Sequence, residues 1–324
     1  MGTRQNKQSV LFLFRGLLPI LPAIGRLAYG TDMRLPLEPP KMWGYTDDQL
    51  AAVPLVFRED ALQGQVCLIS GGGSGIGRGI AYVLSRLGAE IAICGRRVEK
   101  LEETASGMRR LLGKDAMFKP MSIRDPEEVE TLIGEVWARF GRLDHLVNCA
   151  GGQYPQAAID FSVKGWNAII DTNLNGSWYM MQSAARRWRD RTQSGSIVNI
   201  VAVVNRGMPQ VAHTAAARAG VIYLSKTLSV EWAPLGIRVN CVAPGSIATD
   251  GLNVYPRDAA ESFVVSNPMK RLGDVVDIAQ SVAYLASASG KFITGETVHV
   301  DGGRQNWGED WPGGIPDYYR VTQR

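Results

Sequence analysis

Three glycines at the end of a short apolar run have the spacing of a phosphate-binding turn. The run covers 66–70, and a helix-patterned segment follows the glycines. Glycine admits φ > 0 and lets backbone N–H groups approach a ligand closely. At the start of a helix such groups bind a diphosphate, so this context favours a dinucleotide site over a plain tight turn. The loop that we expect to hold the dinucleotide comprises Gly71, Ser74, Gly75, Ile76 and Gly77.

The end of the next apolar run indicates which dinucleotide binds. A carboxylate there, about 20 residues after the glycines, would accept a hydrogen bond from the ribose 2′-OH of NAD. This chain instead has Arg96 and Arg97 after Gly95. Two guanidiniums can bind a 2′-phosphate, although both side chains could also be plain solvated charges. We therefore expect the cofactor to be NADPH (NADP).

Short apolar runs and helical patterns alternate from Leu62 to Gly303. The predicted strands are 66–70, 90–94, 145–148, 196–200, 238–242 and 297–300. The clearest predicted helices are 77–87, 98–112 and 127–140. This alternation is typical of a parallel sheet that is covered on both faces. We predict the α/β class, with a single Rossmann-like, doubly wound parallel sheet, helices on both faces and an N-terminal extension.

We expect the chain to be organised in three parts. Residues 1–60 form an N-terminal extension, 61–303 the NADP-binding domain, and 304–324 an aromatic C-terminal tail. The stretch 9–29 is apolar but contains two arginines and two prolines. Its unbroken apolar runs are far shorter than the ~18 residues that indicate a membrane span. We expect no transmembrane segment. Packing on the main domain or on another subunit is favoured over organelle targeting or contact with a membrane surface.

The composition excludes several classes of protein. Of 324 residues, 45% are hydrophobic and 20% charged, which is typical of a globular protein rather than a disordered or fibrous one. The net charge of +4 gives no reason to expect nucleic acid as a partner. Four widely spaced cysteines and three histidines predict no metal site and no disulfide framework. A reducing compartment follows, with the cytoplasm as the default. The C-terminus is not a Ser-Lys-Leu peroxisomal address.

Several motifs in this region resemble those of the short-chain dehydrogenase/reductase family. The glycine loop is one, and the segments 148–151, 172–174, 292–295 and 300–303 are similar to four others. The resemblance covers 62–303, about three quarters of the chain. It implies a homo-oligomer, either a dimer or a tetramer. It also implies that the cofactor site is completed by Asn148, Ala150, Gly151, Arg218, Pro244 and Gly245.

The positions that carry proton transfer in that family are filled differently here. The family's usual pair is a Tyr four residues before a Lys on one helix face, where the ammonium lowers the pKa of the phenol. Thr214 and Arg218 occupy those positions, and Val201 or Ala202 stands where the family has a serine. Of the usual set, Asn173 is retained. Because a guanidinium keeps its proton, the resemblance implies that Arg218 positions the cofactor rather than relaying a proton.

One subgroup of the family shares these departures. Within this subgroup, the chain resembles most clearly the peroxisomal trans-2-enoyl-CoA reductase and the peroxisomal 2,4-dienoyl-CoA reductase. The similar segments are 151–154, 164–166, 173–176, 178–180, 205–207 and 213–221. This subgroup uses NADPH and reduces C=C bonds that are conjugated to a thioester. The resemblance therefore implies a small-molecule substrate, an acyl-CoA.

The chemistry of such a reduction fits the missing tyrosine and lysine. Ketone reduction develops an alkoxide and needs an acidic proton beside it. Hydride addition to the β-carbon of an enoyl thioester leaves an enolate, whose oxygen needs hydrogen-bond donors. Its α-carbon takes a proton, which water could supply. We predict Asn173, Thr214 and Arg218 as the catalytic set of an NADPH-dependent enoyl-thioester reductase.

Two other functions stay open. The first is an NAD(P)-dependent alcohol or aldehyde dehydrogenase for an apolar substrate such as a terpenoid alcohol, although alcohol oxidation needs a base. The second is a non-catalytic homologue that binds the cofactor. In this family the segment 250–267 usually covers the substrate. Here it mixes apolar and polar residues, which suits an apolar chain without identifying it.

Five further residues have a structural interpretation beside a functional one, or a structural one alone. Tyr154 is equally able to reach the substrate or to form a wall of the site. For His213 we favour a core or capping role over that of a catalytic base. Tyr223 faces away from the site on its predicted helix, and we expect it to be packed. Lys226 and Glu231 are expected at the helix surface.

Overall fold

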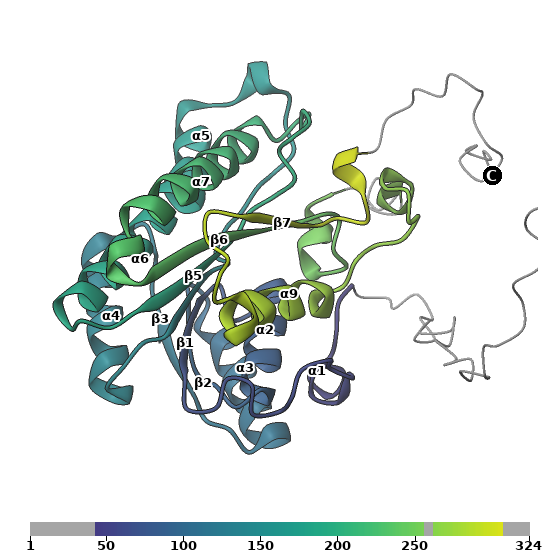
Figure 1. Cartoon of the computed structure of the whole chain (residues 1–324). Helices are drawn as coiled ribbons and strands as arrows, with labels where there is room; N and C mark the ends of the chain where they lie inside the picture. The colour runs from purple at the N-terminus through teal and green to yellow at the C-terminus, as the bar shows by residue number, and fades with distance from the viewer. Residues whose placement is uncertain (1–42, 256–261, 307–324) are drawn as a thin grey trace, which may run out of the picture. The chain divides into compact units, whose positions relative to one another are not determined.

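A computed structural model describes residues 43–255 and 262–306. These residues form a seven-stranded parallel sheet with the order β3-β2-β1-β4-β5-β6-β7 (Figure 1). The strands are β1 (Val66–Ser70), β2 (Glu90–Gly95), β3 (Ala116–Pro120), β4 (His145–Asn148), β5 (Gly195–Ile200), β6 (Ile237–Pro244) and β7 (Thr297–Val300). After β3 the chain returns to the centre of the sheet, so β1 and β4 are neighbours. The strand order reverses there, which is where open α/β sheets bind ligands.

Helices cover both faces of the sheet. One layer contains α2 (Gly75–Arg86), α3 (Val98–Leu112) and α9 (Val275–Ala286). The other contains α4 (Pro126–Phe140), α6 (Gly176–Asp190) and α7 (Ala212–Glu231). The shorter helices are α1 (Asp47–Ala52), α5 (Val163–Ile170) and the 3-10 turns Ala158–Asp160, Ala233–Leu235, Asp250–Val254, Phe263–Ser266, Ala288–Gly290 and Arg304–Asn306. The predicted fold class, with helices on both faces of a doubly wound parallel sheet, is confirmed.

Among the strands of the sheet, β3 is the one that the sequence pattern does not predict. It pairs with β2 at the edge of the sheet, from Ala116 opposite Ile91 to Pro120 opposite Gly95. None of its residues is fully buried, and the Phe118 side chain is 37% exposed. An edge strand of this kind shows no continuous apolar run, so periodicity alone does not reveal it.

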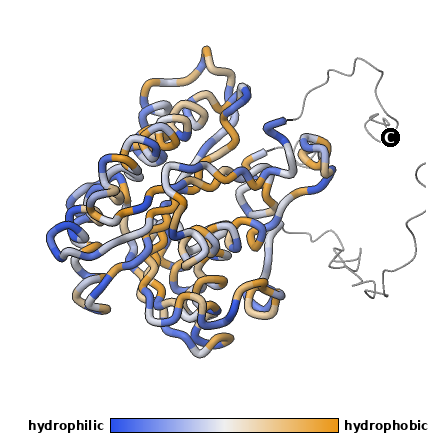
Figure 2. Tube along the Cα trace, in the orientation of Figure 1, coloured by the Kyte–Doolittle hydropathy of each residue, from blue (hydrophilic) through white to orange (hydrophobic). Residues whose placement is uncertain are grey.

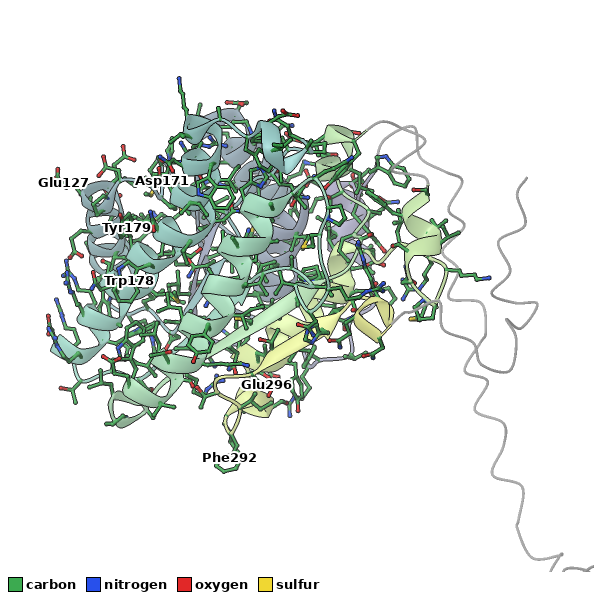
Figure 3. All side chains as sticks on the ribbon, turned by 90° about the horizontal axis from the view of Figure 1, so that it is seen from above. Glu127, Asp171, Trp178, Tyr179, Phe292 and Glu296 are labelled. Atoms are coloured by element: carbon green, nitrogen blue, oxygen red, sulfur yellow. The ribbon has the colours of Figure 1, made fainter. Side chains whose placement is uncertain are left out.

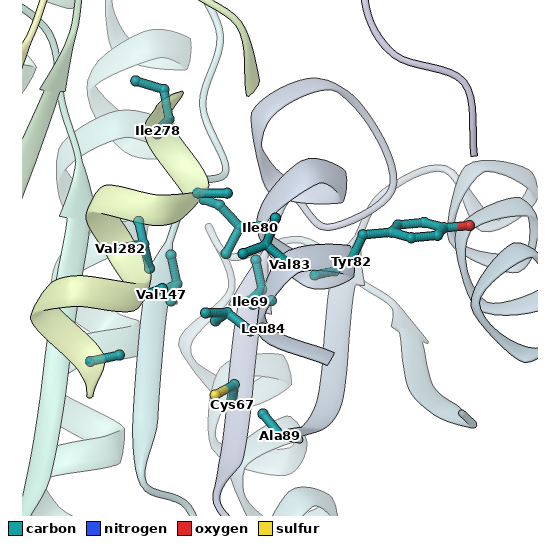
Figure 4. Packing of buried hydrophobic residues seen from close by; sticks show 14 of the residues in the cluster. Cys67, Ile69, Ile80, Tyr82, Val83, Leu84, Ala89, Val147, Ile278 and Val282 are labelled. Atoms are coloured by element: carbon teal, nitrogen blue, oxygen red, sulfur yellow. The ribbon is translucent and has the colours of Figure 1, made fainter. Parts of the chain in front are cut away.

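The core between the sheet and α2 and α9 consists mainly of apolar side chains. Figure 4 shows Val282 of α9 beside Ile80 and Leu84 of α2, with Ile69 and Val147 of the strands between the helices. All five side chains are fully buried. Each contributes roughly 1.5–3 kcal/mol relative to an exposed position. The hydropathy colours show the same pattern, with the central strands mainly hydrophobic (Figure 2). This layer holds the start of α2 firmly against β1.

The opposite layer contains a buried tryptophan that joins a helix to a strand end. Trp188 of α6 is fully buried, and its Nε1–H donates to the carbonyl oxygen of Leu143 over 2.6 Å. A buried indole N–H needs such a partner. The contact fixes α6 beside the start of β4 and so helps to place the residues at the other end of α6.

Residues 43–60 pack on the main domain through α1. The helix begins with a capping box at Thr46, and its first-turn Asp47 forms an ion pair with Arg78 of α2. Arg86 donates hydrogen bonds to two carbonyl oxygens at the end of α1. Among all the described residues, no helix has the length and apolar character needed to cross a membrane. The segment 9–29 and the tail from 307 lie outside the described residues.

Candidate active site

A cleft of about 710 Å³ opens at the carboxyl ends of the strands. Its walls come from the loops after β1, β2, β4, β5 and β6, from α7, and from the turn Asp250–Val254. Side chains and backbone groups from segments far apart in the sequence therefore meet in one cavity. The volume is that of a site for a small molecule or cofactor.

The glycine loop is shaped by contacts that no larger residue would allow. Gly71 has φ = +73° and lies so close to Ala150 that a Cβ would be 2.9 Å from its backbone. Gly75 also has a positive φ, of +51°. A Cβ on Gly77 would overlap the carbonyl oxygen of Gly71. The loop therefore folds tightly between β1 and α2, in the manner expected of a dinucleotide-binding turn.

The start of α2 is open to a negatively charged ligand. Ser74 is the N-cap residue, yet its side chain makes no capping hydrogen bond. The loop itself lines the cleft. The first N–H groups of a helix have no partner within the helix and carry its positive dipole end. The residues present therefore fit the diphosphate of a dinucleotide.

Arg96 and Arg97 follow β2 at the edge of the cleft. Both side chains are exposed, and neither has an ion-pair partner in the described parts of the chain. The Nη2 of Arg97 lies 3.2 Å from the hydroxyl oxygen of Ser74. The two cations thus stand beside the glycine loop with no carboxylate between them, an arrangement that suits a phosphate group.

Asn173 lies in a π-helical turn, Asp171–Asn175, between α5 and α6. Such turns are rare and occur frequently at functional sites. The side chain is 1% exposed and holds both backbone polar groups of Gly152: its Oδ1 accepts from the N–H over 3.0 Å, and its Nδ2 donates to the carbonyl over 2.9 Å. Asn173 therefore fixes the loop after β4.

Thr214 and Arg218 lie one turn apart on α7 and both line the cleft. The hydroxyl of Thr214 donates to the carbonyl oxygen of Gly152 over 3.3 Å and lies 3.5 Å from Asn173 Nδ2. The structure thus brings the three residues of the predicted catalytic set to one wall of the cleft. A threonine hydroxyl can donate a hydrogen bond but is a poor acid.

Arg218 is a buried cation with no partner of its own. Its side chain packs on Gly151, where a Cβ would overlap the guanidinium. In 43–255 and 262–306 it forms no hydrogen bond and no ion pair, and burial lowers its pKa. The nearby thiol of Cys149 stays protonated, because burial raises its pKa to about 12. A lone guanidinium directed at the cleft fits the hydroxyl or phosphate groups of a cofactor.

The remaining predicted cofactor residues divide into two groups. Ala150, Gly151, Pro244 and Gly245 line the cleft, as does every residue of the glycine loop named above. Asn148 does not: it is 1% exposed, and its Nδ2 donates to Asn199 Oδ1 over 2.8 Å. Its side chain links β4 to β5 beneath the cleft and does not face the ligand.

The structure places three residues for which the sequence suggests a structural role, a functional role or both: Tyr154, His213 and Tyr223. Tyr154 is not among the residues that line the cleft; its ring packs against Phe161 and His213, with centroids 5.6 and 4.7 Å away. His213 is fully buried, and its Nδ1 accepts from the N–H of Thr214 over 2.7 Å, as expected of a core histidine. The expectation that Tyr223 is packed is wrong, because its side chain is 74% exposed. It lies on the outer face of α7.

The cleft also contains residues that the sequence does not mark as part of a site. Tyr255, Gln210 and Arg304 all line the cleft, although they lie on three separate segments. Gln210 has φ = +67°, a conformation unusual for a residue other than glycine. No sequence motif marks Arg304 as a site residue. Tyr255 lies in the segment 250–267, which is expected only to cover the substrate. Across the described ranges, His, Cys, Asp and Glu form no group able to hold a metal ion.

Comparison with known proteins agrees with this geometry. Residues 71–305 match a family described as Enoyl-(Acyl carrier protein) reductase. A probable 2,4-dienoyl-CoA reductase of Bacillus subtilis is 36% identical over 256 residues, which is 78% of this chain and 100% of that protein. The peroxisomal 2,4-dienoyl-CoA reductase of Mus musculus is also 36% identical, over 86% of this chain and 94% of its own. The chain belongs to the short-chain dehydrogenase/reductase family of NAD(P)-dependent oxidoreductases.

Relatives with other activities are equally similar. The 3-oxoacyl-[acyl-carrier-protein] reductase of Staphylococcus aureus is 37% identical over 73% of this chain and 96% of its own. Among solved structures, the citronellol catabolism dehydrogenase of Pseudomonas aeruginosa has a TM-score of 0.69 and 36% identity, covering 77% of this chain and 98% of that one. Membership of the family therefore sets the fold and the reaction class, while the substrate depends on the site.

Proposed function

We propose that this protein is an NADPH-dependent reductase of the C=C bond of an enoyl thioester, with an acyl-CoA as substrate. The observation that carries the proposal is the pair Thr214 and Arg218 on α7, which together with Asn173 forms the polar wall of the cleft. Neither member of the pair can pass an acidic proton to a developing alkoxide. The guanidinium of Arg218 can donate hydrogen bonds, and the Thr214 hydroxyl can do so once it turns away from the Gly152 carbonyl oxygen. Reduction of an enoyl thioester needs donors of this kind for the enolate oxygen.

The cofactor residues support NADPH. When bound, NADPH supplies a hydride for the β-carbon of the substrate. Arg96 and Arg97 would bind the 2′-phosphate, and the start of α2 would bind the diphosphate. Arg218 would hold the ribose hydroxyls next to the nicotinamide, which fits a buried guanidinium that has no hydrogen-bond partner among the described residues. Asn173 would keep the loop after β4 in place through its two bonds to Gly152.

Similarity to the dienoyl-CoA reductases of Bacillus subtilis and mouse supports an acyl-CoA substrate. A second candidate is an alcohol dehydrogenase for an apolar alcohol, which the similarity to the citronellol catabolism dehydrogenase favours. A 3-oxoacyl reductase is the third. Both alternatives require proton transfer at an oxygen, for which the wall formed by Thr214 offers no acid or base.

The proposal includes a homo-oligomer in the cytoplasm. Phe292 is 99% exposed and projects from the surface beyond β7 (Figure 3). Val230 of α7 is exposed as well, at 77%. In the proposed oligomer a neighbouring subunit would cover these apolar side chains. Sedimentation velocity of the full chain should give a dimer or a tetramer, and a monomer at micromolar concentration would contradict this part.

The test of the activity is NADPH oxidation followed at 340 nm with medium-chain trans-2-enoyl-CoA and 2,4-dienoyl-CoA. NADH, a 3-oxoacyl thioester and citronellol with NADP are assayed in parallel. We expect turnover with at least one of the two unsaturated thioesters, and NADPH preferred over NADH. Turnover of the alcohol or the ketone alone would replace the proposal with the corresponding alternative. NADPH binding without any turnover would indicate a non-catalytic homologue.

A further inference from the structure

Tyr255 is the single phenol among the residues that line the cleft. It ends the 3-10 turn Asp250–Val254, and its ring packs edge to face on Phe263 with centroids 5.1 Å apart. The side chain is half-buried. Two elements after β6 thus hold an ionisable hydroxyl in the cavity, whereas the residues of α7 that line it, Thr214 and Arg218, supply no acid of this kind.

The hydrogen bond at the Tyr255 hydroxyl leaves its proton free. Nε2 of Gln153 donates to the Tyr255 oxygen. An amide N–H is a donor, so the phenol accepts this bond and its own O–H remains to be placed. Within the described residues, no acceptor takes that proton. A ligand in the cleft can therefore receive it.

The same bond ties Tyr255 to the residues of the catalytic wall. Gln153 directly follows Gly152, whose carbonyl oxygen accepts from both Thr214 and Asn173. The short loop that contains Gly152 and Gln153 therefore contacts the side chains of Thr214, Asn173 and Tyr255. The phenol and the α7 pair lie around the same part of the cleft.

A cation also lies near the phenol. Arg304 lines the cleft, and its Nη1 donates to the hydroxyl oxygen of Ser246 over 3.2 Å. The adjacent carboxylate, Asp301, is occupied by the N–H groups of Gly303 and Gln305. Arg304 forms no ion pair with a described residue. Burial raises the pKa of Tyr255, while Gln153 and the charge of Arg304 act in the opposite direction. The phenol is thus protonated at neutral pH, and a nearby cation stabilises it after the proton leaves.

We propose that Tyr255 is the proton donor of the reaction, with Arg304 as the charge that stabilises its phenolate. The inference rests on the proposed enoyl-thioester reduction. Hydride addition at the β-carbon moves the C=C electron pair toward the thioester carbonyl and forms an enolate. The enolate electron pair then forms a C–H bond at the α-carbon with the Tyr255 proton, while the O–H bond breaks and leaves a phenolate. Water then protonates the phenolate and becomes hydroxide. A proton from the solution neutralises the hydroxide, so each turnover consumes one proton.

Other proton sources in the cleft are less suited. The hydroxyl of Thr214 already donates to Gly152, and its pKa lies far above that of a phenol. The thiol of Cys149 is held protonated by burial, with no cation bonded to it. Arg218 keeps its proton throughout. The family's phenol and cation on one helix are thus replaced by a phenol and a cation on two loops.

The test compares Tyr255→Phe with Tyr223→Phe, a matched change at an exposed position on the outer face of α7. For Y255F we expect kcat with the enoyl-CoA or dienoyl-CoA to fall about 100-fold, the size of a general-acid effect. The KM values for thioester and NADPH should change less than threefold. Y223F should keep the wild-type kcat. Thermal unfolding of both variants checks that they fold alike.

A third variant, Gln153→Leu, separates proton donation from the positioning of the loop. It removes the amide but keeps the phenol, so we expect less than a tenfold loss of kcat. If Q153L and Y255F lose the same activity, the bond positions the loop and the proposal is wrong. A Y255F enzyme with more than half of the wild-type kcat overturns it as well and leaves the proposed function intact. A wild-type enzyme without thioester turnover overturns both.

Discussion

The hydroxyl of Thr214 donates to the carbonyl oxygen of Gly152 over 3.3 Å. That oxygen also accepts from Asn173 Nδ2 over 2.9 Å, so two side chains from different helices hold one peptide group. Asn173 additionally accepts from the N–H of the same residue. Of these three side-chain hydrogen bonds to Gly152, Asn173 makes two and Thr214 makes one. Both residues therefore support the loop after β4.

This arrangement predicts unequal effects of substitution at the two positions. Thr214→Val keeps the shape of the side chain and removes one weak hydrogen bond, so kcat should fall less than tenfold. Asn173→Ala leaves the N–H of Gly152 unpaired and its carbonyl oxygen bonded to Thr214 alone, and should destabilise the fold by about 1–3 kcal/mol, with a larger loss of kcat. Urea unfolding and steady-state kinetics of the two variants check this. An N173A enzyme as stable and active as T214V would contradict it.

The two arginines after β2 predict the cofactor preference. Arg96→Ala with Arg97→Ala should raise KM for NADPH about 10–100-fold, because the two exposed arginines together are expected to contribute roughly 1.5–3 kcal/mol to binding of the 2′-phosphate. KM for NADH should change less than threefold. The matched control is Arg109→Ala on α3, whose guanidinium is exposed and pairs with Asp115 away from the cleft. An equal rise in KM for both cofactors would show that the arginines do not read the 2′-phosphate.

The tight glycine loop predicts that one added methyl group lowers both the stability of the fold and the affinity for NADPH. In Gly77→Ala the new Cβ would overlap the carbonyl oxygen of Gly71 and force the turn open. We expect a loss of about 1–3 kcal/mol in the free energy of unfolding and at least tenfold weaker binding of NADPH, measured by its fluorescence. Gly207→Ala is the control, since a Cβ there has no neighbour within 4 Å. Unchanged NADPH binding in G77A would exclude the loop as the diphosphate site.

The sequence predicts the framework better than the contents of the cleft. The buried strands β1 and β4 begin and end where their predicted runs do, because buried parallel strands are rich in apolar residues. The predicted bounds of β7 are also correct, although this edge strand is only partly buried. The glycine loop is visible because its neighbours along the chain already define a turn between strand and helix. Local patterns of this kind carry most of the information about the fold.

The residues that the sequence does not reveal are brought together by distant contacts. Tyr255 meets Gln153 across 102 positions of the chain, and Arg304 meets Ser246 across 58. No periodicity connects such pairs. Asn148 shows the reverse case: its motif suggests the cofactor site, but its side chain turns to Asn199 of the next strand. Position along a strand does not say which way a polar side chain points when both faces are buried.

The buried His145 predicts how stability depends on pH. It lies on β4 with 5% of its surface exposed, and its Nε2 pairs with Gln65 Oε1 while Nδ1 has no partner. Protonation would bury an unpaired N–H, so burial lowers the pKa of His145 from 6.5 to about 4, against the opposing charge of Asp144. Between these two pKa values the unfolded chain binds a proton that the folded chain does not. His145 therefore destabilises the fold progressively as the pH drops below 6.5.

The expected size follows from the same two pKa values. At pH 5 the unfolded state gains about 2 kcal/mol from protonation of His145, whereas at pH 7.5 it gains almost nothing. We expect His145→Gln, whose amide cannot titrate, to show that much less loss of the free energy of unfolding between pH 7.5 and pH 5 than the wild type. Urea unfolding at both pH values measures it. Parallel curves for the two proteins would mean that His145 accepts its proton in the folded state as readily as in the unfolded one, which its unpaired Nδ1 argues against.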